Sequence, residues 1–372
     1  MERDTVAVDK QISEWFAHFH AFPEVSWKEV ETTRKLAEIL TSMDVKHHTF
    51  NDVTGVVAEI GEGEKIIAVR ADIDALWQEV DGEFRANHSC GHDANMSMVL
   101  GALAYLKEQE LGCRVRFIFQ PAEEKGNGAN SMIERGAVDG VSHLFGVHLR
   151  PKEEIPFGKV SPAIHHGAAI FLEGKIKGED AHGARPQQGK NALDPIFALA
   201  AFLKTIHFSP YEPYSAKLTK IQAGGDSLNI IPGTATFGID MRAQSNNVLK
   251  ELKERVSNGI RSISELHNIE IDLNWSDYTP AAEVSEEAAE IAAEAIRESL
   301  DEDSFAPAII TSGSDDFHFY TIHRPDLKAA MIGIGADLGP GLHHPDMTFN
   351  YDALDIGARV LASTLQKASF AN

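Results

Sequence analysis

Residues 115–124 read VRFIFQPAEE, a short and mostly apolar run that leads into a proline and two adjacent acids. A run of this length and composition predicts a strand that is buried on both faces of a sheet. Similar runs, separated by stretches of helical periodicity, occur at residues 56–60, 66–69 and 144–147. We therefore predict an α/β fold whose central mixed sheet is flanked by helices.

The middle of the chain predicts a second domain, inserted into the first. Between about residues 169 and 273, the expected order of strand, helix, strand, strand, helix, strand is that of a ferredoxin-like α+β unit. The α/β pattern then resumes with a helix, a strand and a closing helix, at residues 286–300, 329–334 and 353–367. The predicted boundaries are 1–167 and 276–372 for the discontinuous first domain, and 168–275 for the insert.

Charge and composition exclude several classes of protein. The 34 Lys and Arg residues against 56 Asp and Glu residues give a net charge of −22, which repels nucleic acid and anionic membranes. The start of the chain lacks the pattern of a signal peptide, and no apolar run is long enough to span a membrane. Two cysteines are too few for a disulfide framework, so we expect a soluble protein in the cytoplasm.

The segment Cys90-Gly91-His92-Asp93 is the strongest local signal for chemistry. A thiolate and an imidazole two residues apart can reach one small volume if the backbone is kinked, and Gly91 permits that kink. The simpler alternative is a buried cysteine beside an aspartate that caps the following helix.

The acids Glu123 and Glu124 follow the strand predicted at residues 115–119. Adjacent acids point in different directions, so one can bind a cation while the other moves a proton. The strand ends of open α/β sheets are where ligand sites lie. Two solvated acids in a loop remain the alternative.

Histidines complete the candidate cluster. His148 ends the strand at 144–147, and His343 and His344 lie in a loop after the strand at 329–334. Each alone is more simply explained as a satisfied polar residue, but all fall at predicted strand ends or in loops of one domain. Their mixture with Cys90, His92 and Glu124 suits a transition metal such as zinc or manganese, and five ligands favour two ions that share one of them.

Two further acids, Asp72 and Asp74, follow the strand at residues 66–69. A carboxylate there can orient a metal-binding imidazole by accepting its second N–H. An aspartate-rich turn is nearly as good an explanation for Asp74.

Five ordered motifs resemble those of one family. The motifs are RADIDAL (70–76), CGHD (90–93), FIFQPAEE (117–124), GVHLRP (146–151) and LHHP (342–345). In this order and spacing, the chain resembles the di-metal aminoacylase and carboxypeptidase-type hydrolases. The most similar branch contains hippurate hydrolase, indole-acetyl-amino-acid amidohydrolases and N-acetyl-amino-acid deacetylases.

The resemblance implies a role for each matching residue. Two divalent ions per subunit, zinc or manganese with cobalt and nickel as further candidates, would be bound by Cys90, His92, Glu124, His148 and His343. Glu123 would be the general base and Asp72 its supporting acid. In the insert, implied to be the lid and dimerisation domain of a homodimer, His182 would stabilise the tetrahedral intermediate in the partner's active site, and Asn229 and Arg242 would hold the substrate carboxylate.

The chain also departs from its relatives at positions around the site. Asn95 stands where most relatives have a second histidine after CGHD, and residues 312–317 read SGSDDF in place of the usual GGEDF. Within the insert, the segment Glu179-Asp180-Ala181-His182 stands in place of the common Gly-Gly-His. None of these changes falls on the five expected ligands, so they bear on substrate preference more than on the reaction.

The function that the resemblance implies is hydrolysis of the amide bond of small N-acyl amino acids by a metal-bound hydroxide. A dipeptidase or carboxypeptidase using the same metals is the alternative within enzymes. The alternative that is not an enzyme is a binding protein that retains the fold and one structural metal. The presence of Glu123 argues against this alternative.

Overall fold

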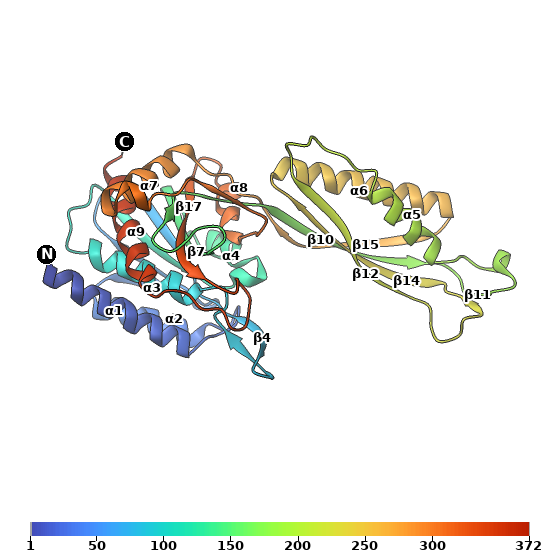
Figure 1. Cartoon of the computed structure of the whole chain (residues 1–372), viewed down its shortest axis with the longest axis horizontal. Coiled ribbons are helices and arrows are strands. Elements are labelled where there is room, and N and C mark those ends of the chain that lie inside the picture. The colour runs from blue at the N-terminus through green and yellow to red at the C-terminus, as the bar shows by residue number, and fades with distance from the viewer. Residues whose placement is uncertain (1, 372) are drawn as a thin grey trace. The chain divides into compact units, whose positions relative to one another are not determined.

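A computed structural model describes residues 2–371, with side chains from residue 8 onward. The chain forms two compact units, which are described separately (Figure 1). The first unit comprises Met1–His165, Glu283–Ile310 and Asp316–Asn372, and the second comprises His166–Ala282 and Thr311–Asp315. The described helices include none that is long and apolar enough to cross a membrane.

A seven-stranded sheet forms the centre of the first unit. In spatial order its strands are β1 (Lys46–Thr49), β2 (Val56–Ile60), β6 (Arg114–Gln120), β3 (Ile66–Asp72), β7 (Val141–Pro151), β17 (Lys328–Leu338) and β8 (Val160–Ser161). The four central strands from β6 to β17 are parallel, whereas β1, β2 and β8 pair antiparallel with their neighbours. The predicted α/β class with a mixed sheet is confirmed.

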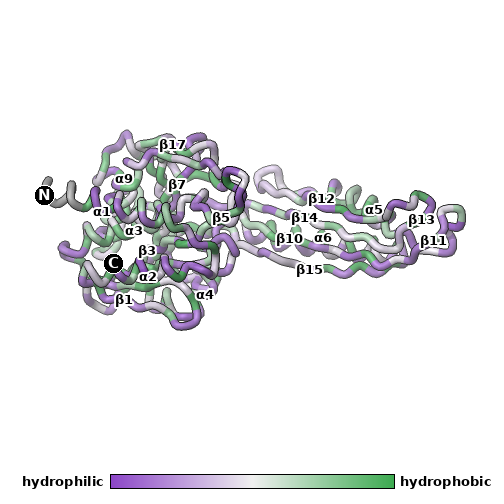
Figure 2. The backbone as a smooth tube through the Cα atoms, turned by 90° about the horizontal axis from the view of Figure 1, so that it is seen from below, coloured by the Kyte–Doolittle hydropathy of each residue, from purple (hydrophilic) through white to green (hydrophobic). Residues whose placement is uncertain are grey.

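Helices cover both faces of this sheet. They are α1 (Glu2–Ala21), α2 (Val30–Ser42), α3 (His92–Leu106), α4 (Gly128–Glu134), α7 (Glu286–Ser299), α8 (Phe319–His323) and α9 (Ala353–Phe370). Strand β3 contributes to an apolar core on each face of the sheet. Its Ile67 and Val69 pack in the core that includes α1, α3 and α9. Its Ile66 and Ala68 pack in the core that includes α4 and α8. Successive side chains of a strand point to opposite faces, so a strand buried on both must be apolar at nearly every position. In Figure 2 hydrophobic stretches run through β3 and β7, and hydrophilic residues gather in the loops.

Several short elements lie outside the main sheet. They are the two-stranded pairs β4 (Leu76–Val80) with β5 (Glu83–Asn87) and β9 (Ile164–His166) with β16 (Ile309–Thr311), and the single 3₁₀ turns at Glu123–Lys125, Glu302–Ser304 and Asp316–His318. The sequence did not predict the β4–β5 hairpin.

The second unit is a four-stranded antiparallel sheet with two helices. Its strands lie in the order β12 (Tyr214–Ala223), β14 (Thr234–Ala243), β10 (Ala168–Lys177) and β15 (Glu270–Thr279), and its helices are α5 (Leu193–Leu203) and α6 (Asn246–His267). The two short strands β11 (Ala181–His182) and β13 (Ile230–Ile231) pair with each other, and a 3₁₀ turn occupies Pro186–Gln188. This strand order and connectivity are those of the predicted ferredoxin-like unit.

Helix α6 shows how the sequence specifies this unit. The Ser245 side chain accepts a hydrogen bond from the backbone N–H of Val248 and so caps the first turn. The buried side chains of α6 recur every three or four residues, at Val248, Leu249, Leu252, Val256, Ile260 and Ile263. They pack in one apolar core with the strands of the sheet.

The boundaries of the second unit differ from those expected. The expected boundary at residue 275 falls inside β15, because β15 continues to pair with β10 as far as Thr279 opposite Ala169. The unit extends to Ala282 and also includes Thr311–Asp315, a return of the chain that strand periodicity gives no means of predicting.

Candidate metal centre

Cys90 and His92 are brought together by the kink that the sequence predicted. Gly91 has a left-handed backbone, with φ of 85°, and it is the residue from which α3 begins at His92. Both side chains are buried, and Cys90 Sγ lies 3.6 Å from Nε2 of His148, near the middle of β7. Burial and the nearby charge of Glu124 raise the pKa of the Cys90 thiol.

The adjacent acids lie at the end of β6, as expected. Ala122 has φ of 54°, and this left-handed residue turns the chain into the single 3₁₀ turn that begins at Glu123. Both carboxylates approach the same imidazole: Glu123 Oε2 is 3.8 Å and Glu124 Oε1 is 3.9 Å from Nε2 of His92. The two acids thus face one small volume, each almost removed from solvent.

His343 reaches this volume from its loop, and His344 does not. His343 Nε2 lies 3.5 Å from Glu124 Oε1, and the interaction with this carboxylate raises the pKa of His343. The loop is fixed by a hydrogen bond from the backbone N–H of His343 to Ser89 O (2.8 Å) and one from Gln78 Nε2 to His343 O (3.0 Å). His344 instead accepts a hydrogen bond from the backbone N–H of Asp346.

The donor atoms form overlapping groups that could each hold a cation. Within each group all donor atoms lie within 4.8 Å of one another; the groups include Cys90 with His92 and His148, Cys90 with Glu124 and His343, and His92 with Glu123 and Glu124. All five expected ligands therefore converge. The donor set of thiol, imidazole and carboxylate suits a transition metal.

Two buried atoms of the cluster test whether a metal fits. His92 Nε2 and Glu124 Oε1 are both buried without a hydrogen-bond partner. A buried polar atom left unpaired costs about 1–3 kcal/mol, so native structures rarely keep one without a purpose. Both atoms face the region between the other donors, and a cation there would satisfy them.

Asp72 is held by a buried network behind this cluster. Arg70, fully buried, donates to Asp72 Oδ2 (2.6 Å), Asp316 Oδ1 (2.7 Å) and Gln120 Oε1 (2.9 Å). Asn95, which replaces the histidine of most relatives, donates to Asp72 Oδ1 at 2.8 Å. Asn95, which departs from the relatives, and Asp316, which matches them, therefore contribute to one network around Asp72.

In the second unit, two of the expected substrate residues lie together and the third lies apart. His182 pairs with Ile230 across β11 and β13, and Gly183 donates its N–H to Asn229 O at 2.7 Å. His182 and Asn229 are both exposed. Arg242 lies near the end of β14, where it pairs with Asp240 at 3.0 Å.

One family model matches most of the chain, over residues 68–367, and it is described as peptidase family M20/M25/M40. The chain is a member of the M20 family. The match covers all five clustered donors, from Cys90 to His343.

Two relatives resemble this M20 chain over nearly its whole length. IAA-amino acid hydrolase ILR1-like 2 of Arabidopsis thaliana is 30% identical over 368 residues, which cover 92% of this chain and 82% of the relative. N-acetyl-L-cysteine deacetylase of Bacillus subtilis is 31% identical over 365 residues, with coverage of 93% and 85%. A solved structure described as a dinuclear metal-binding peptidase of the M20 family, from Bacillus subtilis, matches with a TM-score of 0.80 at 25% identity, covering 96% of this chain and 98% of that one.

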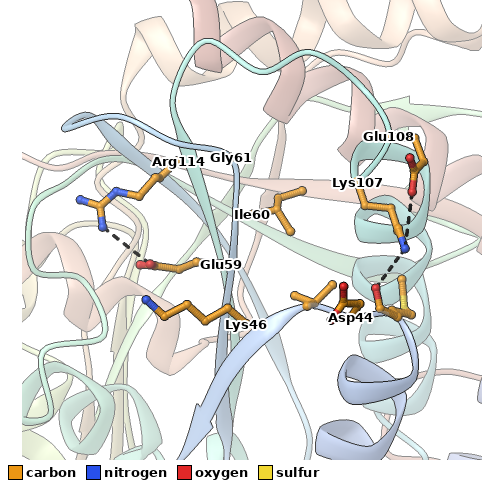
Figure 3. Close-up of a pocket in the computed structure, with 10 residues that line it drawn as sticks. Asp44, Lys46, Glu59, Ile60, Gly61, Lys107, Glu108 and Arg114 are labelled. Carbon is orange, nitrogen blue, oxygen red and sulfur yellow. Dashed lines mark hydrogen bonds and ion pairs between the residues drawn. The ribbon is translucent and has the colours of Figure 1, made fainter.

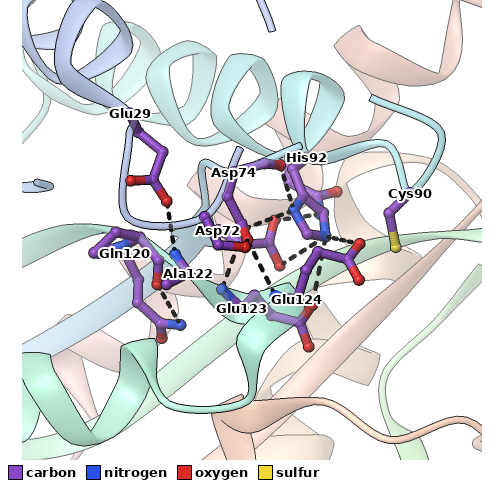
Figure 4. A network of polar contacts seen from close by, with 12 residues as sticks. Glu29, Asp72, Asp74, Cys90, His92, Gln120, Ala122, Glu123 and Glu124 are labelled. Atoms are coloured by element: carbon purple, nitrogen blue, oxygen red, sulfur yellow. Dashed lines mark hydrogen bonds and ion pairs between the residues drawn. The ribbon is translucent and has the colours of Figure 1, made fainter. Parts of the chain in front are cut away.

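Other residues of this M20 chain that support the cluster were missed by sequence reasoning. Figure 4 shows Glu29, a buried acid from the start of α2, accepting the backbone N–H of Ala122 at 2.9 Å. Thr54 donates to its other oxygen at 2.6 Å, and burial raises the pKa of Glu29. Ser26, three residues earlier, donates to Asp74. An acid inside an otherwise amphipathic stretch is the only signal that could have indicated Glu29.

A pocket elsewhere in the first unit of the M20 chain lacks such a concentration of unpaired donors. It has a volume of about 480 Å³ and lies beside the end of α3, β1 and β2 (Figure 3). Lys107 donates to Met43 O at 2.9 Å and pairs with Glu108, and Arg114 pairs with Glu59. These ion pairs are of the ordinary surface kind, so we assign no function to this pocket.

Proposed function

We propose that this M20-family chain is a metal-dependent amidohydrolase that cleaves the amide bond of small N-acyl amino acids. The observation that carries the proposal is the convergence of Cys90, His92, Glu124, His148 and His343, with His92 Nε2 and Glu124 Oε1 buried and without hydrogen-bond partners. The substrate class is supported by the relatives, whose names describe hydrolysis of amino-acid conjugates and removal of an N-acetyl group.

The five clustered side chains would hold two divalent ions, zinc or manganese with cobalt and nickel as further candidates. Cys90 shares one donor group with His92 and His148 and another with Glu124 and His343, so it lies near all four other ligands and is our candidate for the shared one. Bound there, two cations would supply a water of lowered pKa and positive charge for the developing oxyanion. Their chemistry agrees with the description of the solved relative as a dinuclear metal-binding peptidase.

Glu123 would move the proton. Its carboxylate faces the same volume as Glu124, with Oε2 3.8 Å from His92 Nε2, so it can take a proton from the attacking water and deliver it to the leaving amine. Its other oxygen lies 3.4 Å from the backbone N of Asp316, which restricts the side chain to this direction.

The second unit would bind substrate and a second copy of the chain. Arg242 and Asn229 would hold the substrate carboxylate, and the partner subunit's His182 would stabilise the tetrahedral intermediate. A homodimer is supported by β12, which lies at the edge of its sheet, and by the exposed apolar side chains of Ile221, Leu228 and Ile230. An edge strand offers unpaired backbone groups to a partner. Free thiols at Cys90 and Cys113 support a cytoplasmic location.

A substrate panel tests the proposal. Protein loaded with zinc, manganese or cobalt is assayed against N-acetyl, N-benzoyl and indole-acetyl amino acids and against dipeptides with free amino groups. We expect faster turnover of the N-acyl amino acids, and no turnover by Glu123→Gln loaded with the same metal, which controls for contaminating hydrolases. Faster turnover of dipeptides would favour a dipeptidase, and metal binding without turnover of either class would favour a binding protein.

A further inference from the structure

Helix α1 is held on the first unit by a close contact among three helices. It packs against α3 and α9, and its side chains Ile12, Phe16 and Phe19 are buried (Figure 1). A Cβ atom on Gly101 of α3 would lie 2.6 Å from Ile12 Cδ1 and 2.8 Å from Ala358 Cβ of α9. The three helices therefore meet where α3 lacks a side chain, because only glycine leaves room for so close an approach.

A cluster of polar side chains lies about one turn from this contact on each helix. Asp9 comes from α1, Tyr105 from α3 and Asp355 from α9. Each is three or four residues from the member of the apolar contact on its own helix, and so shares a helix face with it. Tyr105 Oη lies 2.8 Å from Asp9 Oδ1 and 2.7 Å from Asp355 Oδ1. One hydroxyl thus joins the carboxyl groups of two helices.

The geometry of this cluster requires a proton on one of the two carboxyl groups. A hydroxyl has one hydrogen, so Tyr105 donates to only one of its partners and must accept a hydrogen bond from the other. An ionised carboxylate only accepts, whereas a protonated one can also donate. With both acids ionised, one of the two contacts would set oxygen lone pairs against each other with no hydrogen between them.

Asp9 is the acid that holds this proton. Nε of Arg359 donates to Asp355 Oδ2 at 2.7 Å, which favours the ionised form of Asp355. Burial and the nearby carboxyl group of Asp355 raise the pKa of Asp9 above its usual value of 3.8, against the opposing effects of Tyr105 and Arg359. Among the described side chains, the titratable and charged groups that face Asp9 are Tyr105 from α3, and Asp355 and Arg359 from α9.

We propose that Asp9, Tyr105 and Asp355 form a proton-dependent clasp that fastens α1 to α3 and α9. With the proton in place, Asp9 donates to Tyr105, and Tyr105 donates to Asp355. As pH rises, the proton on Asp9 passes to solvent, two carboxylates then face one phenol, and this part of α1 is loosened.

The direction of the pH dependence follows from the proton that the folded state holds. The folded chain binds the proton on Asp9 more tightly than the unfolded chain does. The stability that the clasp adds is therefore complete below the unfolded-state pKa, and it is lost as pH rises through the folded-state pKa. His20, at the other end of α1, also loses a contact as pH rises, so variants must be compared at the same pH.

Hydrogen exchange followed by mass spectrometry tests the clasp in the whole chain. Exchange in residues 8–16 is measured at about pH 5 and about pH 8, both above the usual pKa of aspartate, and corrected for the pH dependence of intrinsic exchange. The variants are Asp9→Asn, whose amide N–H can donate to Tyr105 at any pH, and Asp9→Ala, which removes both charge and hydrogen bond. Glu14→Gln removes an exposed acid of the same helix and is the matched control.

We expect corrected exchange in wild-type α1 to be faster at the higher pH, by up to about tenfold for each unit by which the pKa of Asp9 is raised. Asp9→Asn should exchange more slowly than wild type at about pH 8, because it keeps the donor and carries no charge. Asp9→Ala should lose the same part of the pH dependence but exchange faster than Asp9→Asn. Glu14→Gln should match wild type at both pH values.

Corrected exchange in wild type that does not rise with pH would overturn the proposal. So would Asp9→Asn that exchanges like wild type at the higher pH, or Glu14→Gln that slows exchange as much as Asp9→Asn does. Circular dichroism reports whether each variant is folded. If Asp9→Asn does not fold, Tyr105→Phe decides, because it removes the shared hydroxyl, and wild-type exchange of that variant at the lower pH counts against the clasp.

Discussion

His182 and Arg242 lie toward opposite ends of the sheet in the second unit. Within β14, Thr234 lies opposite Lys177 and Arg242 lies opposite Ala169, and the eight residues between them span about 27 Å at 3.4 Å per residue. His182 pairs with Ile230, before the Thr234 end of that strand (Figure 1). One copy of this unit cannot place both side chains on one small substrate, so a site that uses both needs two subunits.

Mixed dimers test this arrangement. His182→Ala and Glu123→Ala should each be nearly inactive alone, but subunit exchange between them should restore activity. A heterodimer has one complete site, formed by Glu123 of one chain and His182 of the other, so a statistical mixture should reach about a quarter of the wild-type activity. Activity is measured before and after exchange, and the mixture is compared with His182→Ala alone. No recovery after verified exchange would mean that His182 does not act across the dimer.

Alanine variants of the two adjacent glutamates should show that one residue acts in catalysis and the other in metal binding. Glu123→Ala should lower kcat by about 10²–10⁴-fold with unchanged metal content, because it removes the proton-transferring group. Glu124→Ala should lose metal, because it removes a ligand oxygen that is buried without another partner. Metal analysis and steady-state kinetics on both variants check this. Loss of metal from Glu123→Ala with retention in Glu124→Ala would reverse the two roles.

Glu29 should stabilise the turn that precedes the catalytic acid. In Glu29→Ala, the buried N–H of Ala122 loses its acceptor, and the free energy of unfolding should fall by about 1–3 kcal/mol. Glu29→Gln keeps an oxygen at this place and should lose less. Urea denaturation of both metal-free variants measures the difference, and kcat should fall more in the alanine variant. Equal stability of the two variants would show that this hydrogen bond does not matter.

His20 should make stability depend on pH. Its Nδ1 lies 2.7 Å from Asp93 Oδ2, and this hydrogen bond raises the pKa of His20 above its usual value of 6.5. Because the folded state binds the proton more tightly, the added stability is complete below the unfolded-state pKa and is lost as pH rises through the folded-state value. The difference in free energy of unfolding between wild type and His20→Ala should therefore be larger at pH 5.5 than at pH 8.5, about one unit below and two units above that usual value.

Urea denaturation of metal-free protein at both pH values measures this difference. His48→Ala, at an exposed histidine of β1, serves as the control for the loss of an imidazole. A His20→Ala difference that grows with pH would contradict the assigned pairing.

The sequence was sufficient for the fold class and for the convergence of the donors. Apolar runs of strand length predicted the buried strands, and Cys90, Glu124 and His148 each lie within or next to a strand or at a helix start, where local pattern determines the backbone. Gly91 was expected to allow the kink before α3, and its left-handed conformation provides it.

The sequence was not sufficient for contacts between distant segments. Nothing local indicates that Ser26 donates to Asp74, 48 residues away, or that Glu29 accepts the N–H of Ala122. The assignment of Asp72 as the supporting acid stays a prediction for a related reason. Both acids follow β3 directly, and which of them reaches Nδ1 of His92 depends on how the chain turns after the strand.

Cys90, His92, Glu124, His148 and His343 should bind two cations in one site. Anomalous diffraction from crystals of the zinc-loaded protein would locate these ions. We predict two strong peaks, each in contact with side chains of this set, with Cys90 within reach of both. Peaks elsewhere on the chain, or none at these side chains in zinc-saturated crystals, would contradict the account.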